Sequence, residues 1–309
     1  MRLNVENDKC PSDIFPFRAA IRYLAYLLFL LPSFLSAASA VESVGQGIPD
    51  TLCLQKIPER PRDAITGLQF ARETTGMTGE EQQSKALGEL RRGNIPDFLR
   101  KLKPVHFNYR KPRGEMITAI IWATPDYVAI GSDEDFLRIP LTYPSAVAVA
   151  EAFECVLPTP KMVDAIYEQS TCHLEPDPLP PGPMMRSSEY FLKHREMIRN
   201  QRQQAGCALG ELVSGHKKDV VITNRLNRKP GRIAIYGWHT KNGEPIQPLS
   251  IFHGKNYADY SHGLRLIYKT VWINGKPRSL LEVLQDPRVA PVLTDEGFIN
   301  KLLKMLHLR

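Results

Sequence analysis

Residues 215–265 read GHKKDVVITNRLNRKPGRIAIYGWHTKNGEPIQPLSIFHGKNYADYSHGLR. The runs 218–223 and 232–238 are short, rich in β-branched and aromatic residues, and bounded by Gly, Asn and Pro, which is typical of strands. A Lys-Asn-Gly tripeptide at 241–243 is a tight-turn sequence. We therefore predict that 232–250 forms a β-hairpin.

The same stretch carries four of the eight histidines of the chain. Imidazole is the side chain best suited to proton transfer or metal ligation near neutral pH. Side chains delivered from strand ends and loops onto a rigid sheet are the usual material of a functional site. A His or Asp in a β-loop is also commonly a hydrogen-bonded surface residue, so both interpretations remain open. The four are His216, His239, His253 and His262.

Outside this stretch, helices and strands occur in blocks rather than in alternation. Capping boxes at Thr66-x-x-Gln69 and Thr78-x-x-Glu81 predict the first two helices. The block pattern predicts a mixed α+β fold, with an antiparallel sheet from 104–141 and 209–275 and helices at its edges and both termini. The predicted helices are 67–75, 79–92, 96–102, 144–153, 161–170, 188–204, a short one after Ser279, and 295–307.

Five segments are predicted from composition and pattern, and the last three, 104–309, are expected to fold together as one domain. Pro176, Pro178, Pro180, Pro181 and Pro183 mark the spacer as an ordered or polyproline-like linker. The segments are a signal peptide (1–40), an N-terminal helical segment (41–103), strands with two helices (104–172), a proline-rich spacer (173–187), and a His-rich β segment with C-terminal helices (188–309).

The N-terminal 40 residues have the layout of a secretory signal peptide. Arg18 and Arg22 precede an apolar run at 24–40 that is interrupted by Pro32 and ends in Ala-Ser-Ala, which predicts export and cleavage after Ala40. An uncleaved anchor is the alternative, although a spanning helix needs about 20 unbroken apolar residues. We expect a secreted or periplasmic protein with no stable membrane span after cleavage.

Four cysteines follow the predicted signal peptide, which contains Cys10. In an exported chain they allow two disulfides in three possible pairings, and the sequence does not choose among these. Cys155 is an alternative nucleophile, although its place after a predicted helix favours a structural role. The four are Cys53, Cys155, Cys172 and Cys207.

The charge of the chain is mildly positive. A formal net charge of +7 is spread over scattered basic residues, which excludes a nucleic-acid-binding stripe. A weak attraction to an anionic envelope polymer or glycan is the most that this charge supports. An apolar content of 43% is sufficient for a buried core.

The imidazoles and carboxylates of 215–265 favour a hydrolytic site. His253 and His262 would act as general bases or as ligands of a divalent metal such as zinc, with Asp219 or Asp259 as the orienting carboxylate. No H-E-x-x-H or H-x-H spacing occurs, so the sequence does not decide whether a metal takes part. The predicted catalytic residues are His216, Asp219, His239, His253, Asp259 and His262.

Substrate contacts are predicted in the same stretch. Basic side chains would bind an anionic group, and aromatic rings would offer stacking faces. The same aromatic residues are equally typical of a core. The predicted contacts are Lys218, Tyr236, Trp238, Tyr260 and Arg265.

The sequences FHG at 252–254 and SHGLR at 261–265 resemble the L,D-transpeptidase signature, which has an upstream HG and a downstream S-H-G-C-x-R. The signature's cysteine is replaced by Leu264, Arg265 comes one position early, and the two histidines are closer together. Because leucine cannot attack a carbonyl, the resemblance does not imply cross-linking by that mechanism.

A broader set of phrases resembles a group of exported bacterial proteins without an assigned activity. That resemblance implies export and a single co-folded unit, and it carries no catalytic residues across. The phrases are LPTPKMVDAIY (157–167), GHKKDVV (215–221), AIYGWH (234–239), IQPL (246–249) and DYSHGLRL (259–266).

Together these observations predict a secreted, hydrolase-like protein that acts through a His/Asp site on a cell-envelope or extracellular polymer, either peptidoglycan or polysaccharide. The alternative is a non-catalytic secreted protein that binds the envelope or a carbohydrate.

Overall fold

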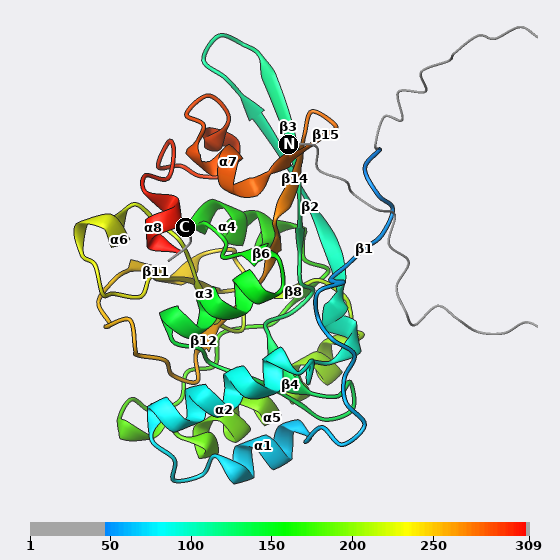
Figure 1. The fold of residues 1–309 in the computed structure, drawn as a ribbon, viewed down its shortest axis with the longest axis vertical. Coiled ribbons are helices and arrows are strands. Elements are labelled where there is room, and N and C mark those ends of the chain that lie inside the picture. The colour runs from blue at the N-terminus through cyan, green and yellow to red at the C-terminus, as the bar shows by residue number, and fades with distance from the viewer. Residues whose placement is uncertain (1–46, 307–309) are drawn as a thin grey trace, which may run out of the picture.

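The computed structural model describes residues 47–306 (Figure 1). The predicted signal peptide and its cleavage site lie outside the described residues. Both predicted capping boxes are present. The hydroxyls of Thr66 and Thr78 each accept a hydrogen bond from the backbone N–H of the third helical residue, and the side chain of that residue accepts one from the backbone N–H of the threonine. They begin α1 (Gly67–Glu73) and α2 (Gly79–Arg91), close to the predicted bounds.

The larger of the two main sheets has seven strands. Its long hairpin pairs β2 (Lys101–Arg110) with β3 (Met116–Ala123), and the strand order is β1-β2-β3-β13-β6. β14 joins β3 and forms a hairpin with β15, through an Asn-Gly turn in which both residues have positive φ. The other strands are β1 (Leu52–Cys53), β6 (Cys155–Val156), β13 (Ile267–Tyr268), β14 (Thr270–Ile273) and β15 (Lys276–Ser279).

The second sheet has four strands in the order β11-β10-β9-β12. The predicted hairpin at 232–250 is present as β10 and β11, whereas β12 runs parallel to β9. In that parallel pair His262 lies opposite Lys218. The strands are β9 (Lys218–Val220), β10 (Ile235–His239), β11 (Pro245–Ser250) and β12 (His262–Gly263).

The predicted α+β class is confirmed, but the strands of 104–141 and 209–275 do not form one antiparallel sheet. The chain crosses between the two sheets at residues 264–266, directly after β12 and before β13. There the carbonyl of Leu264 accepts a hydrogen bond from the N–H of Val128, and the carbonyl of Leu266 accepts one from Thr124. These long-range bonds hold the crossover against the segment that follows β3, and they leave no local sequence signal.

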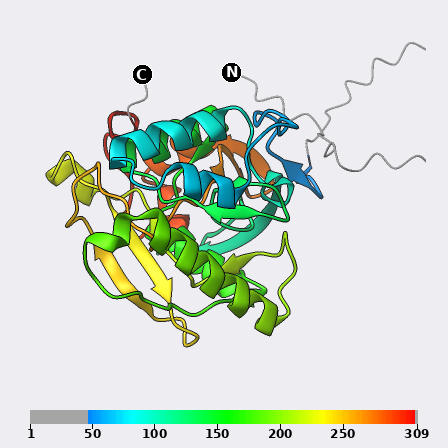
Figure 2. The ribbon, with the colours of Figure 1, turned by 90° about the horizontal axis from the view of Figure 1, so that it is seen from below.

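Three further helices pack around the sheets: α3 (Tyr143–Ala152), α4 (Pro160–Gln169) and α5 (Ser188–Ala205). α1 packs against α5, and α2 packs against α3 (Figure 1). Figure 2 shows α5 on the same side of the molecule as the β10–β11 hairpin. All three helices agree with the predicted ranges to within one residue at each end.

The remaining elements are short. The predicted helix at 96–102 is reduced to the 3-10 turn η2 because strand β2 begins at Lys101, and of the predicted helix at 295–307 only α8 forms within the described residues. These elements are η2 (Asp97–Arg100), β4 (Ala129–Gly131), β5 (Phe136–Arg138), β7 (Cys172–His173), η3 (Pro183–Arg186), β8 (Val213–Ser214), α6 (Arg225–Arg228), α7 (Leu280–Gln285), η4 (Ala290–Val292) and α8 (Leu302–Met305).

One apolar core runs through the described chain, from Leu52 to Leu306, and it includes the N-terminal helices as well as both sheets. The proline-rich spacer packs onto this core. Leu179 is buried, and its N–H donates to the hydroxyl of Tyr260 at 2.7 Å. The spacer is therefore held in place by tertiary contacts.

A disulfide joins Cys172 to Cys207. Cys155 is a free, buried thiol, so no pairing that includes it forms, and Cys53 is disulfide-bonded without it. A structural disulfide is typical of proteins that mature in an oxidising compartment. Among residues 47–306, no helix has the length and apolarity needed to cross a bilayer.

Candidate functional site

The segment that leads from β11 into β12 brings two histidines, a tyrosine and an aspartate into contact. We call this group the His262 cluster, and it consists of His253, Tyr257, Asp259 and His262. His262 is placed by the parallel pairing of β12 with β9. The next residue, Gly263, lies so close to Tyr127 that a Cβ atom there would come within 2.4 Å of its ring, so only glycine fits.

The contacts within the cluster form a chain from His253 to His262. The rings of His253 and Tyr257 stack with centroids 4.0 Å apart and an interplanar angle of 9°. The Tyr257 hydroxyl donates to a carboxylate oxygen of Asp259 at 2.9 Å, and the same oxygen lies 3.8 Å from Nε2 of His262. The other oxygen of Asp259 accepts from both the N–H and the hydroxyl of Ser261. The carboxylate is thus held in a defined orientation beside His262.

His262 is completely buried, and neither ring nitrogen has a hydrogen-bond partner among residues 47–306. Burial, together with the positive charges of Lys218 and Lys217, lowers its pKa to about 4 against the attraction of Asp259. The ring is therefore neutral at pH 7. Buried polar groups nearly always have partners, so an unpaired imidazole calls for an explanation such as a chemical role.

His253 differs from His262 because its side chain is only half-buried. Burial also lowers the pKa of His253, with Asp259 opposing and Lys218 contributing. Burial disfavours the ionised form of Asp259, but the attraction of His262 and the hydrogen bonds from Ser261 outweigh it and hold the carboxyl pKa below its usual value. At neutral pH the cluster thus holds a carboxylate and two uncharged imidazoles, of which one reaches solvent.

Lysine side chains approach the cluster from β9 and the residue before it. The ammonium of Lys218 lies 4.8 Å from the ring centroid of Trp238, and burial lowers its pKa. Lys217 is fully buried and donates to the carbonyl of Tyr260 at 2.5 Å. Burial lowers the pKa of Lys217 to about 7. Of the two, only Lys218 is partly exposed and can meet a ligand.

His216 belongs to a different group, which we call the Asp126 network. The carboxylate of Asp126 receives two hydrogen bonds from Arg138, at 2.8 and 2.5 Å. Nε2 of His216 lies 3.2 Å from Oδ1 of Asp126, and Nη1 of Arg202 lies 3.5 Å from the other carboxylate oxygen. All four side chains are buried. Burial lowers the pKa of His216 to about 4, so this histidine is a neutral part of a buried ionic scaffold.

Asp219 lies apart from both groups. Its carboxylate accepts a hydrogen bond from the Tyr127 hydroxyl at 2.7 Å and lies 3.8 Å from Nε of Arg265. Burial raises the pKa of Asp219 to about 6, against the attraction of Arg265. Arg265 itself is fully buried and donates to the carbonyls of Thr124 and Val213. The predicted substrate anchor therefore holds the two sheets together and does not face a ligand.

His239 pairs with a residue that the sequence did not single out. Its Nε2 lies 2.9 Å from a carboxylate oxygen of Asp164 on α4, and the Tyr236 hydroxyl donates to the same carboxylate. The His239 ring also stacks on Tyr167, with centroids 4.6 Å apart. Asp164 is partly exposed, at 40% of its side chain, whereas His239 is buried. This pair is a second, separate combination of imidazole and carboxylate.

The six predicted catalytic residues thus divide among four local environments. His253, Asp259 and His262 meet in one cluster, while His216, Asp219 and His239 each have partners elsewhere. Among the predicted substrate contacts, Trp238 and Tyr260 are buried, in addition to Arg265. Lys218 and Tyr236 are half-buried. Tyr260 contributes a hydrogen bond to the spacer and a core contact, and no stacking face.

The residues missed by sequence reasoning lie in stretches that read as ordinary strands and helices. Asp126, Tyr127 and Arg138 lie in the region 104–141 that is predicted as sheet, and Asp164 lies in the predicted helix 161–170. The signal that could have found them is a charged residue within an apolar run, since lone charges are seldom buried unless paired. Such a signal gives no partner, because the partners are distant along the chain.

Two other predicted chemistries receive no geometric support. Within residues 47–306, no group of three or more His, Cys, Asp or Glu side chains is arranged to hold a metal ion, and zinc stays a prediction. The thiol of Cys155 is buried and donates to the carbonyl of Phe153. Burial raises its pKa well above the ordinary value, which disfavours the reactive thiolate.

Comparison of the chain with protein-family models, with curated proteins and with solved structures finds no match. The resemblance to the L,D-transpeptidase signature stays a prediction, although its two histidines, His253 and His262, lie with ring centroids 6.3 Å apart.

Proposed function

We propose that the chain is an exported hydrolase that acts on a polymer of the cell envelope or the extracellular space, and that the His262 cluster is its active centre. The observation that carries the proposal is the stacking of His253 on Tyr257, whose hydroxyl is hydrogen-bonded to the carboxylate that lies beside His262. It combines an uncharged, solvent-accessible imidazole with an oriented carboxylate, which are the two groups that general-base hydrolysis needs.

In this proposal His253 is the catalytic base. A water molecule adds to the scissile bond of the polymer, its proton passes to the imidazole of His253, and the imidazole then gives the proton to the leaving group. His253 suits this role better than His262, because its half-buried imidazole can come within hydrogen-bond reach of a substrate or water proton. A pKa of about 4 and complete burial remove His262 from direct proton transfer.

Tyr257, Asp259 and His262 are positioning residues in this scheme. Asp259 fixes the Tyr257 hydroxyl, and Tyr257 in turn presents its ring face to His253. Two cations are available for an anionic substrate. The charge of Lys218 acts on both histidines of the cluster, and the guanidinium of Arg186 lies over the Tyr257 ring, 5.6 Å from its centroid. Arg186 also lines a cavity of about 350 Å³ that reaches Ala258, which leaves room for part of a polymer.

The test is digestion of purified peptidoglycan sacculi and of a set of polysaccharides, followed by mass spectrometry of released fragments and by a reducing-end assay. We expect His253→Gln to lower the rate at least about 100-fold, since general-base catalysis contributes at least that much. His106→Gln is the matched control, because His106 is exposed on β2 and far from the cluster in the sheet order. Equal rates for the two variants would refute the role of His253.

A non-catalytic binding protein is the second candidate, and one observation favours it. Phe252 is 78% exposed and lies edge-on to His253, with centroids 5.3 Å apart. An exposed aromatic ring beside a stacked pair is a suitable contact for a sugar or peptide. Release of no fragments from any polymer, together with sedimentation of the protein with sacculi that is lost in Phe252→Ser, would select this candidate.

A further inference from the structure

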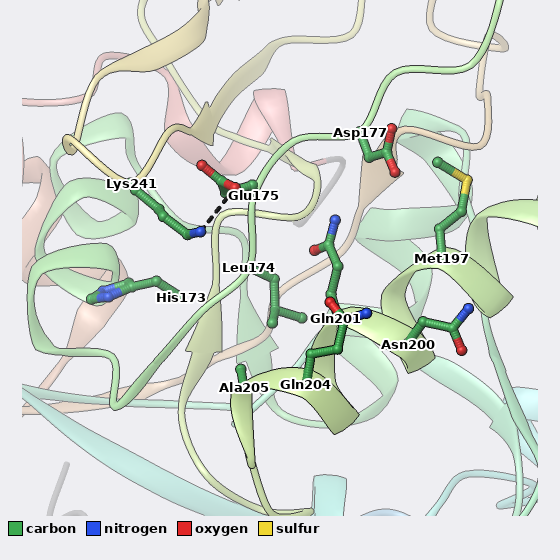
Figure 3. A pocket seen from close by; sticks show the side chains of 10 residues that line it. All are labelled: His173, Leu174, Glu175, Asp177, Met197, Asn200, Gln201, Gln204, Ala205 and Lys241. Atoms are coloured by element: carbon green, nitrogen blue, oxygen red, sulfur yellow. Dashed lines mark ion pairs between the residues drawn. The ribbon is translucent and has the colours of Figure 1, made fainter.

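A groove of about 560 Å³ separates α5 from the segment that follows β7 (Figure 3). It is distinct from the His262 cluster, since none of the four cluster residues lines it. The volume lies within the range of ordinary small-molecule sites. Lys241, at the turn of the β10–β11 hairpin, lines it as well. Three separate parts of the chain thus meet around one space.

The face of α5 that lines the groove carries three carboxamide side chains. Met197, Asn200, Gln201, Gln204 and Ala205 follow the spacing i, i+3, i+4, i+7 and i+8, which places them on one stripe of the helix. Such a stripe is normally apolar and buried. On α5 the buried positions lie elsewhere, at Phe191, His194, Ile198 and Arg202. The three carboxamides are therefore turned toward the groove and away from the core.

The carboxamides have hydrogen-bonding capacity to spare. The side-chain oxygen of Gln201 is buried and has no hydrogen-bond partner within residues 47–306. An unpaired buried acceptor is unfavourable, so rotation of the half-buried Gln201 carboxamide toward a ligand hydroxyl would give its oxygen a bond that the free protein lacks. Each carboxamide both donates and accepts, and a hydroxyl group does the same.

The charges across the groove restrict the ligand further. Glu175 forms an ion pair with Lys241 at 3.0 Å, drawn as a dashed line in Figure 3. Asp177 lines the same side and has no ion pair among the described residues. An anionic ligand would meet these two carboxylates, and an apolar ligand would leave the amides unpaired. A neutral ligand rich in hydroxyl groups satisfies both requirements.

The walls of the groove are fixed in advance. The disulfide joins Cys172, directly before His173 on one wall, to Cys207, two residues after the end of α5 on the other. The ring of His173 is held by its contact with Tyr167, with centroids 4.4 Å apart. Preorganised walls reduce the ordering that binding would otherwise require.

We propose that this groove binds a neutral saccharide, with its hydroxyl groups bonded to Asn200, Gln201, Gln204 and Asp177 and its apolar face against Met197. The inference goes beyond hydrolysis and does not depend on it, because binding here needs no residue of the His262 cluster. If the protein also cleaves a glycan, the groove would hold a part of the chain that is not being cut.

The test is titration of the full exported chain with chitotetraose, cellotetraose and maltotetraose by calorimetry, with the Met197 methyl signal followed by NMR. We expect at least one sugar to bind and to shift that signal. Gln201→Leu and Gln204→Leu should each weaken binding about tenfold, because each removes a ligand hydrogen bond. Leucine is a good helix former, so α5 should remain intact.

Gln203→Leu is the matched control, since Gln203 lies on the same helix, is exposed and does not line the groove. It should bind sugar like the natural protein, and so should His253→Gln, which separates this inference from the proposed hydrolysis. The proposal is overturned if none of the three sugars binds at millimolar concentration. It is also overturned if binding leaves the Met197 signal unmoved, or if Gln203→Leu weakens binding as much as Gln204→Leu.

Discussion

The Asp126 network and the His262 cluster each place a histidine beside an aspartate, but they differ in exposure and in the partners of the carboxylate. Asp126 has cationic partners on two sides and a neutral histidine on a third, and every member is buried. In the His262 cluster the carboxylate contacts a tyrosine and a serine, and His253 reaches solvent. A His–Asp contact is therefore structural where every member of the group is buried, and it is available for chemistry where one imidazole reaches solvent.

Removal of Asp126 should have the largest effect on stability. Asp126→Ala leaves Arg138 and Arg202 buried without their carboxylate, and breaking a buried ion pair from one side costs about 3–5 kcal/mol. Urea unfolding followed by circular dichroism measures this. The control is Asp63→Ala, which removes a surface ion pair with Arg92 and should cost under about 1 kcal/mol. Similar losses in both variants would mean that the Asp126 network is not a scaffold.

Acid should destabilise the protein through its buried histidines. The folded-state pKa values of His216 and His262 are about 4, below the usual 6.5, so the unfolded chain takes up protons first as pH falls from 6.5 to 4. Stability is therefore present above pH 6.5 and lost toward pH 4, by up to about 3 kcal/mol per histidine. Urea unfolding at a series of pH values measures the slope.

Asp219 should oppose this trend. Its folded-state pKa is raised to about 6, so the folded protein binds a proton more readily than the unfolded chain between pH 6 and 4, which stabilises the fold as pH falls. Two histidines outweigh one carboxyl, and the net result is loss of stability. His216→Gln should flatten the pH dependence, and Asp219→Asn should steepen it. A profile unchanged by both variants would contradict these pKa shifts.

A moderate effect is expected at the hydroxyl of Tyr127. Tyr127→Phe removes the hydrogen bond to Asp219 and leaves a buried carboxylate with less support, at a cost of about 1–3 kcal/mol. Chemical denaturation of the variant measures this loss. Tyr190→Phe removes a hydroxyl that bonds an exposed carbonyl and should change stability by less than about 0.5 kcal/mol. The comparison shows whether the contact between the two sheets depends on this bond.

Within the two regions compared, the smallest effect on stability is expected at His253. His253→Gln alters a half-buried ring and should cost no more than about 1 kcal/mol, the value of one aromatic contact. Thermal unfolding checks this, and the same variant is the one expected to lose activity. A loss of stability as large as that of Asp126→Ala would place His253 in the scaffold and remove the distinction between the two regions.

The features that could be predicted from the sequence are local: both capping boxes, the Lys-Asn-Gly hairpin, the helices α3, α4 and α5, and the α+β class. The sequence also placed Asp259 and His262 in one segment, because they lie only three positions apart. Each of these features depends on residues within a few positions of one another, where backbone geometry limits the outcome.

Only the tertiary structure decided which histidine pairs with which carboxylate. His216 meets Asp126 across 90 positions, and His239 meets Asp164 across 75. The division of the strands into two sheets and the burial of Arg265 between them were likewise invisible in the sequence. The physical reason is that burial and partner choice arise from packing between distant segments, whereas periodicity and turn chemistry report only on neighbours.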